Sequence, residues 1–72
     1  NKEEAMTIGF IDTYRRSLGP TTPTFVGQVE WWDAGQYLFT ESCGINRVLE
    51  SDALLDAHKL YEDRMEQNLI RR

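Results

Sequence analysis

Two adjacent tryptophans, Trp31 and Trp32, constrain what this 72-residue chain can fold into more than any other feature of its sequence. Residues 25–32 are rich in aromatic and β-branched residues and end at the turn formers Asp33-Ala34-Gly35, which predicts a strand. Successive side chains of a strand point to opposite faces of a sheet, so both indoles cannot enter the same small core. We therefore expect one buried tryptophan and one on the opposite face.

The loop after this strand predicts a hairpin. Its register can be checked by whether the paired residues place apolar side chains on one side. Residues 36–42 read as a second strand, and the three-residue loop 33–35 places its glycine in the left-handed conformation. Pairing Trp32 with Gln36 makes one side nearly all apolar, which indicates the core face. The facing pairs are then Trp31–Tyr37 and Val29–Phe39 on that side, and Glu30–Leu38 on the other.

A third strand is predicted over residues 45–50, after a turn at Cys43-Gly44. It completes an antiparallel meander over residues 25–50. In this arrangement Leu49 lies beside Leu38 on the side away from the core.

Residues 1–18 and residues 51–72 read as amphipathic helices that flank the meander. The first has a cap at Asn1 and a stop at Gly19-Pro20, and its apolar stripe consists of Met6, Phe10, Ile11, Tyr14 and Leu18. The second begins after Ser51, and its stripe consists of Leu54, Ala57, His58, Tyr61, Met65 and Leu69. Residues 19–24, rich in turn formers, read as a linker.

These elements predict one small domain, residues 1–72, of the α+β class with the order α-β-β-β-α. Both helices are expected to pack on one face of the short antiparallel meander, in two layers. The other face of the sheet is then uncovered. Because α+β architecture alone implies no function, any function has to be sought on that face.

The charge distribution narrows the class of partner. The chain has twelve acidic and eight basic residues, a net charge of −4, and no basic residue between Arg16 and Arg47. A protein that tracks a phosphate backbone needs clustered Lys and Arg, so nucleic acid is disfavoured. The alternative that stays open is a nucleic-acid-binding or regulatory domain that combines exposed aromatics with the arginines near the helix ends: Arg15, Arg16, Arg71 and Arg72.

No residue pattern indicates catalysis, a metal or a cofactor. His58 is the single histidine, and with Glu62 it supplies two metal ligands where a zinc site needs three or four. The single cysteine, Cys43, has no neighbouring cation in the sequence that would lower its pKa. We therefore expect no enzyme activity, no metal and no cofactor, and a catalytic or metal-binding subunit built on His58 ranks last.

The sequence also bears on location. No apolar run approaches the ~20 residues that cross a bilayer, and the N-terminal residues resemble neither a signal peptide nor a transit peptide. A single cysteine cannot form an intrachain disulfide, which favours a reducing compartment. A cytoplasmic location is expected.

The uncovered sheet face is the candidate contact surface. An exposed apolar patch on a small domain indicates a partner, and tryptophan is a frequent hot-spot residue. We expect a non-enzymatic protein-interaction module, an inhibitor or regulator, that binds a basic surface of a partner protein or a second copy of itself as a homodimer. No membrane or small-molecule substrate is indicated. The predicted contact residues are Trp32, Val26, Leu38 and Leu49, with an acidic rim of Glu30, Asp33 and Glu41.

Overall fold

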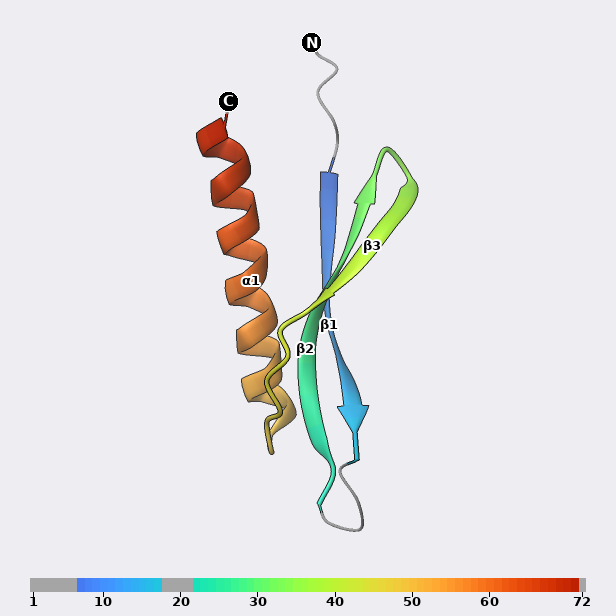
Figure 1. Ribbon diagram of the computed structural model, residues 1–72, viewed down its shortest axis with the longest axis vertical. Helices are drawn as coiled ribbons and strands as arrows, with labels where there is room; N and C mark the ends of the chain where they lie inside the picture. The colour runs from blue at the N-terminus through green and yellow to red at the C-terminus, as the bar shows by residue number, and fades with distance from the viewer. Residues whose placement is uncertain (1–6, 18–21, 72) are drawn as a thin grey trace.

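The computed structural model describes the backbone of residues 7–17 and 22–71, with side chains in those ranges up to Gln67. Its elements are β1 (Thr7–Arg16), β2 (Thr24–Asp33), β3 (Gln36–Ser42) and α1 (Glu50–Arg71). The strands form one antiparallel sheet in the order β1-β2-β3, and α1 packs on one face (Figure 1). The fold is α+β, but the predicted α-β-β-β-α order with two helices is wrong, because the first of the described elements is a strand and α1 is the single helix among them.

The segment for which the spacing predicts a helix, residues 1–18, contains the ten-residue strand β1. Thr, Ile, Phe and Tyr fill most of β1 and favour strands, and Gly9 disfavours a helix. The spacing from Phe10 to Tyr14 is an even number of residues, so it fits one face of a strand as well as one face of a helix. The other features of the predicted helix, outside the described residues, are Asn1, Met6, Leu18 and Gly19-Pro20.

β2 and β3 form a hairpin where the sequence predicts one, but the predicted register is wrong. The turn has two residues, Ala34-Gly35, whose φ angles of 52° and 80° are both positive, as a type I′ turn requires. A β-bulge at Leu38 follows the turn. The two-residue turn places Tyr37 opposite Trp32, whereas the prediction placed it with Trp31, and the bulge then brings Phe39 opposite Trp31. The observed pairs are Asp33–Gln36, Trp32–Tyr37, Trp31–Phe39 and Val29–Glu41.

The third strand predicted over residues 45–50 is wrong, since the described residues after β3 form an irregular connection to α1. This connection still satisfies backbone groups of β2 beyond the end of β3. The Cys43 N–H donates to the Gly27 carbonyl at 2.9 Å, and Arg47 exchanges backbone hydrogen bonds of 2.7 and 2.8 Å with Phe25. An isolated bridge therefore replaces the expected strand.

α1 matches the predicted helix 51–72 to within one residue at each end. Its sheet-facing side differs from the predicted stripe, because His58 and Leu54 are exposed and Leu60, predicted off the stripe, packs against the core. The residues that face the sheet are Ala53, Ala57, Leu60, Tyr61 and Met65. In the described part of the chain, no helix combines the length and the apolar character that a membrane crossing requires.

The core lies between α1 and the two strands β1 and β2. Val29, Trp31 and Ala57 are buried there, and partly buried side chains pack around them. Gly27 lies directly under the helix, where a Cβ atom would come within 2.2 Å of the Ala53 carbonyl oxygen. The helix backbone can therefore approach β2 only because residue 27 has no side chain. β3 lies outside this core and is held to α1 by side-chain contacts.

Candidate functional site

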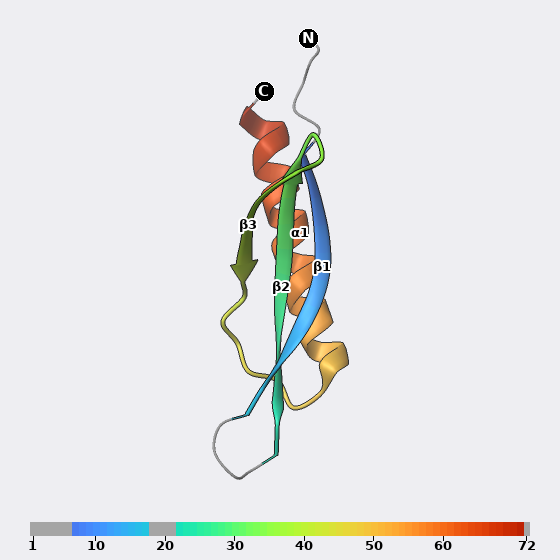
Figure 2. The same cartoon turned by 90° about the vertical axis from the view of Figure 1, so that its right-hand side faces the viewer.

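The face of the sheet opposite α1, the open face, has no helix over it among the described residues (Figure 2). The strand register places on it every second residue of β1 and β2, and the residues of β3 that pair with them. Its members are Ile8, Phe10, Asp12, Tyr14, Arg16, Thr24, Val26, Gln28, Glu30, Trp32, Tyr37, Thr40 and Ser42. The open face is therefore built from all three strands.

Three rings form an aromatic row (Phe10, Trp32 and Tyr37) across the open face, one from each strand. The Phe10 and Trp32 ring centroids lie 6.4 Å apart at 89°, and those of Trp32 and Tyr37 lie 5.6 Å apart at 73°. Edge-to-face packing of this kind is favourable and holds each ring in place. Trp32 thus sits in the middle of a pre-arranged apolar surface.

The aromatic row is accessible. Phe10 is 51% exposed and Tyr37 49% exposed, and Ile8, which pairs directly with Trp32, is 48% exposed. Trp32 itself is partly buried by its neighbours. A contiguous apolar patch of this kind on a small domain is typical of a binding surface. The amphipathic rings of tryptophan and tyrosine are common anchors in such surfaces.

Carboxylates flank the aromatic row on the open face. The Trp32 indole Nε1–H donates to Glu30 Oε1 at 3.2 Å, which fixes both side chains. Glu30 pairs across the strands with Phe10 and Thr40, and the Tyr37 hydroxyl lies 2.8 Å from the Thr40 hydroxyl. Asp12 lies next along β1 on the same face and is exposed. The polar groups around the rings are therefore acidic or neutral.

The structure separates the predicted contact residues. Trp32 and Glu30 lie together on the open face. Val26 belongs to the same face by register but is fully buried, so it offers no contact area. Leu38 is the bulged residue and lines a groove on the helix side together with Trp31 and Met65. The predicted set is therefore not one surface.

The remaining predicted contact residues also lie away from the open face. Leu49 is 59% exposed but precedes α1 in the irregular connection, because the strand predicted for it does not form. Asp33 ends β2 in the helix-facing row, and its Oδ1 is buried without a hydrogen-bond partner among the described residues. The predicted rim of Glu30, Asp33 and Glu41 is replaced by Glu30 and Asp12.

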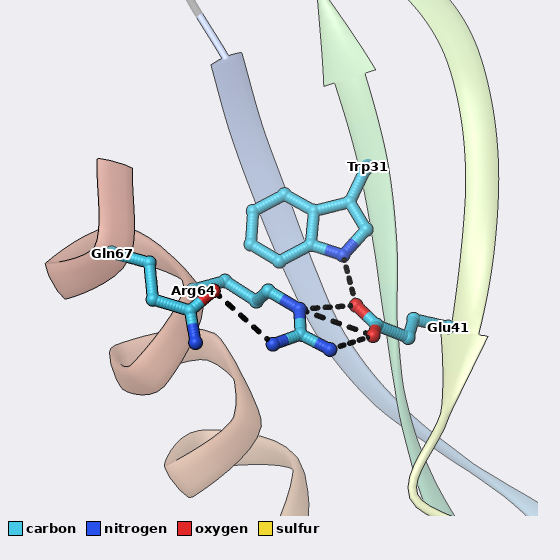
Figure 3. Close-up of polar contacts among 4 residues, drawn as sticks. All are labelled: Trp31, Glu41, Arg64 and Gln67. Carbon is cyan, nitrogen blue, oxygen red and sulfur yellow. Dashed lines mark hydrogen bonds and ion pairs between the residues drawn. The ribbon is translucent and has the colours of Figure 1, made fainter. Parts of the chain in front are cut away.

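Glu41 has a structural position on the helix side of the sheet (Figure 3). Its carboxylate accepts hydrogen bonds from the Trp31 indole at 3.2 Å and from Arg64 Nε at 3.1 Å, and Arg64 Nη2 also binds it. Arg64 additionally donates to Gln67 at 3.4 Å. Bonding to Arg64, and then to Trp31, holds the pKa of Glu41 below its ordinary value although burial opposes this. Glu41 thus fastens β3 to α1.

The sequence analysis missed Ile8, Phe10, Asp12 and Tyr37 as members of the candidate site. Three of them lie in β1, which was interpreted as a helix, and Tyr37 was placed on the other side by the wrong register. The even spacing of Ile8, Phe10 and Asp12 was the signal that could have placed them on one strand face. Their contribution depends on pairing with β2.

The two residues considered for chemistry lie apart from the open face. His58 is exposed on α1. Cys43 is partly buried after β3, and burial, with Asp56 and Glu41 nearby, raises the pKa of its thiol, which makes it a poorer nucleophile. In the described ranges no three His, Cys, Asp or Glu side chains are grouped as a metal site would need.

Comparisons of the chain with protein-family models, with curated proteins and with solved structures find no match. The protein is therefore described by its own structure alone. It is an α+β domain with the order β-β-β-α, in which one sheet face is covered by a helix and the other presents three packed rings.

Proposed function

We propose that this protein is a non-enzymatic protein-interaction module that binds a basic surface of a partner protein through its open face. The observation that carries the proposal is the aromatic row, three exposed or partly exposed rings packed edge to face on an uncovered sheet. Because the rings are already held against one another, binding costs little side-chain entropy. The open face can therefore bind a partner without rearranging these rings.

Charge supports a basic partner. Glu30 and Asp12 flank the aromatic row, and the whole chain carries a net charge of −4. Opposite charge on the partner would steer the encounter and make the association rate fall as salt is added. A domain of this kind acts by occupying the partner's surface, as an inhibitor or regulator does. We propose that it does so in the cytoplasm.

The nucleic-acid alternative has less support. Arg47 is paired with Asp56 at 2.8 Å, and Arg64 is engaged by Glu41. Arg71 and Arg72 lie beyond the described side chains, so Arg15 and Arg16 are the predicted contacts that can be placed, at the end of β1. Phosphate binding draws on several clustered cations, so this pair is a weak basis for a nucleic-acid site.

A site-specific photo-crosslinking experiment tests the proposal. A photoreactive phenylalanine analogue replaces Tyr37 on the open face, and in a matched variant it replaces Leu55, which is 66% exposed on α1. In host-cell extract, we expect a defined partner to be captured from position 37 and not from position 55. The captured partner is then purified, and its dissociation constant is measured.

The purified pair decides the proposal. Trp32→Ala and Phe10→Ala should weaken binding by about tenfold or more each, because a hot-spot truncation costs about 2 kcal/mol or more and about 1.4 kcal/mol corresponds to tenfold. Leu55→Ala serves as the control and should leave the dissociation constant unchanged. Binding should also weaken as salt rises. Equal affinity of wild type and both open-face variants would show that the open face is not the contact surface.

A further inference from the structure

β1 is an edge strand, and among the described residues no strand pairs with its outer side. Gly27, which pairs with Thr13, uses its carbonyl to accept from Cys43 on the far side of β2, and Phe25, which pairs with Arg15, bonds Arg47 there. In an antiparallel pair, a residue whose backbone groups bond to the strand on its other side makes no backbone bond to the residue directly opposite. The N–H and C=O groups of that opposite residue then point away from the pair. Because this direction alternates along a strand, the backbone N–H and C=O groups of β1 point outward at Thr7, Gly9, Ile11, Thr13 and Arg15.

One side-chain contact confirms this orientation. The Thr13 N–H donates to the carboxylate of Asp12, its own neighbour, at 2.7 Å and so is not bonded to β2. For the rest of the outer edge, the sheet order places no other described strand beside β1. A ten-residue edge of this length presents a template for another strand.

The first half of the β1 edge lacks the features that usually block such pairing, whereas the second half carries Asp12, Arg15 and Arg16. Residues 7–11 carry no charge and no proline, and the register with β2 runs without a bulge. The opposite edge differs, because β3 has seven residues and contains the bulge at Leu38. In the described part of the chain, outward-directed donors and acceptors thus coincide with an uncharged, bulge-free segment of edge strand, residues 7–11.

We propose that a second copy of this chain pairs with β1 through its own β1, antiparallel and centred on Ile11. The sheet of the dimer then has six strands, three from each copy. This register pairs nine residues of each strand, 7–15, and places facing side chains on the same face of the sheet, as a continuous sheet requires. The facing pairs are Ile11–Ile11, Gly9–Thr13, Phe10–Asp12, Ile8–Tyr14 and Thr7–Arg15.

The charges select this register over its neighbour. Centring the pair on Asp12 also matches nine residues, but it sets the two Asp12 carboxylates directly opposite each other, which is destabilising. Centring on Ile11 places Asp12 opposite Phe10 and moves the two carboxylates to a diagonal position. Asp12 also has to release the Thr13 N–H to the partner strand, so it opposes dimer formation in two ways.

The helix continues the same interface. Glu50 accepts a hydrogen bond from the Thr13 hydroxyl at 2.8 Å, so the first turn of α1 reaches β1. Leu54 lies one turn further along the same side and is 37% exposed. Figure 2 shows the first turns of α1 projecting past β1 on the side away from β2. In the dimer, this side of α1 faces its copy and buries Leu54.

The dimer does not depend on the proposed binding function. Pairing through β1 leaves the aromatic row of each copy on the same face of one continuous sheet, so the open faces stay accessible. A dimer formed instead by stacking two open faces would bury the aromatic row. Trp32→Ala distinguishes the two dimers, because it should leave the β1-paired dimer intact.

Sedimentation equilibrium and amide hydrogen exchange of the full chain test the inference together. We expect a concentration-dependent dimer in which Gly9 and Ile11 amides, directed outward, become protected as dimer forms. Phe10 and Asp12 amides, directed toward β2, are the matched control in the same strand and should be protected in monomer and dimer. A monomer at all concentrations, or a dimer with unprotected Gly9 and Ile11 amides, would overturn the proposal.

Helix and strand variants sharpen the test. Leu54→Lys should raise the dimer dissociation constant about tenfold or more, whereas Leu55→Lys, its outward-facing neighbour, should leave it unchanged. Asp12→Asn should tighten the dimer, a gain that misfolding cannot imitate. Loss of the dimer in Trp32→Ala, or equal effects of both lysine variants, would point to another interface and reject pairing through β1.

Discussion

The indole of Trp31 and the phenol ring of Tyr61 lie nearly parallel, with an interplanar angle of 8° and ring centroids 5.9 Å apart. The stack joins β2 to α1, and Gly9 of β1 lies against it. A Cβ atom at residue 9 would come within 2.7 Å of Trp31 and 2.8 Å of Tyr61. One contact therefore ties together β1, β2 and the helix, which makes Trp31 the central side chain of the core.

The two adjacent tryptophans should differ in their effect on stability. Trp31 is 4% exposed, so Trp31→Ala should lower the free energy of unfolding by about 3–5 kcal/mol, as for other buried indoles. Trp32→Ala removes ring contacts on the open face, worth about 0.5–1.5 kcal/mol each, and should cost clearly less. Urea unfolding of the two variants measures both losses. Large and equal losses would contradict a sheet with one covered face.

A side chain at residue 27 should separate the helix from the sheet. Gly27→Ala places a methyl group against the Ala53 carbonyl, backbone that cannot move aside without shifting α1. We expect a loss of about 1–3 kcal/mol or more, the usual range for overpacking. Thermal unfolding followed by circular dichroism provides the measurement. An unchanged midpoint would mean that α1 does not lie as close to β2 as described.

The hairpin turn should gain from a substitution. Ala34 has a φ of 52°, a left-handed conformation that costs an ordinary L residue roughly 1–2 kcal/mol and that Asn adopts more readily. Ala34→Asn creates the Asn-Gly pair preferred in type I′ turns and should stabilise the fold by up to about 1 kcal/mol. Urea unfolding tests this, with the exposed neighbour Gln36→Asn as control. A lower stability for Ala34→Asn would argue for a different turn.

Acid should release β3 from α1. The pKa of Glu41 is lowered from 4.5 by its bonds to Arg64, and that of Asp56 is lowered from 3.8 by Arg47. Since the folded-state pKa of each lies below the unfolded value, their stabilisation is fully present above the unfolded pKa. It is lost as the pH falls through the folded-state pKa. Stability should therefore decline below about pH 4.5.

Glu41→Gln separates this contribution from general acid unfolding. The variant keeps the shape of the side chain but loses the charge that Arg64 binds, so its stability should fall less steeply with acid than that of the wild type. Glu62→Gln, on the exposed side of α1, is the matched control. Unfolding in urea at a series of pH values measures both slopes. Parallel curves for wild type and Glu41→Gln would show that the Arg64 bond adds no pH-dependent stability.

Part of this fold could be predicted because the signals were local. The strands around residues 33–35 and the helix from Ser51 follow from turn formers, β-branched residues and a helix cap close together in the chain. β1 could not be assigned from spacing alone, because residues four apart, such as Phe10 and Tyr14, share one face of a strand and also one face of a helix. Its strand state is fixed by pairing with β2, a long-range contact that a local pattern does not contain.

The candidate site shows the same division. Opposite faces for Trp31 and Trp32 followed from strand geometry, and Glu30 followed from its place beside Trp32. The position of Glu41 depends on a two-residue turn and a bulge that together moved the register of β3. Arg64, 23 residues further along the chain, binds this carboxylate, so Glu41 fastens β3 to α1 and does not join the open face.

The close approach of α1 to the sheet also restricts which residues a related protein can carry at the contact. A Cβ atom at position 9 or 27 would collide with core rings or helix backbone, and Ala53 and Ala57 are fully buried where α1 meets Gly27, so we expect these four positions to favour Gly or Ala. The exposed residues of the open face, such as Phe10 and Tyr37, are under no such packing restriction. A distant relative would therefore be recognised by four small residues at this spacing, long after its aromatic row had changed.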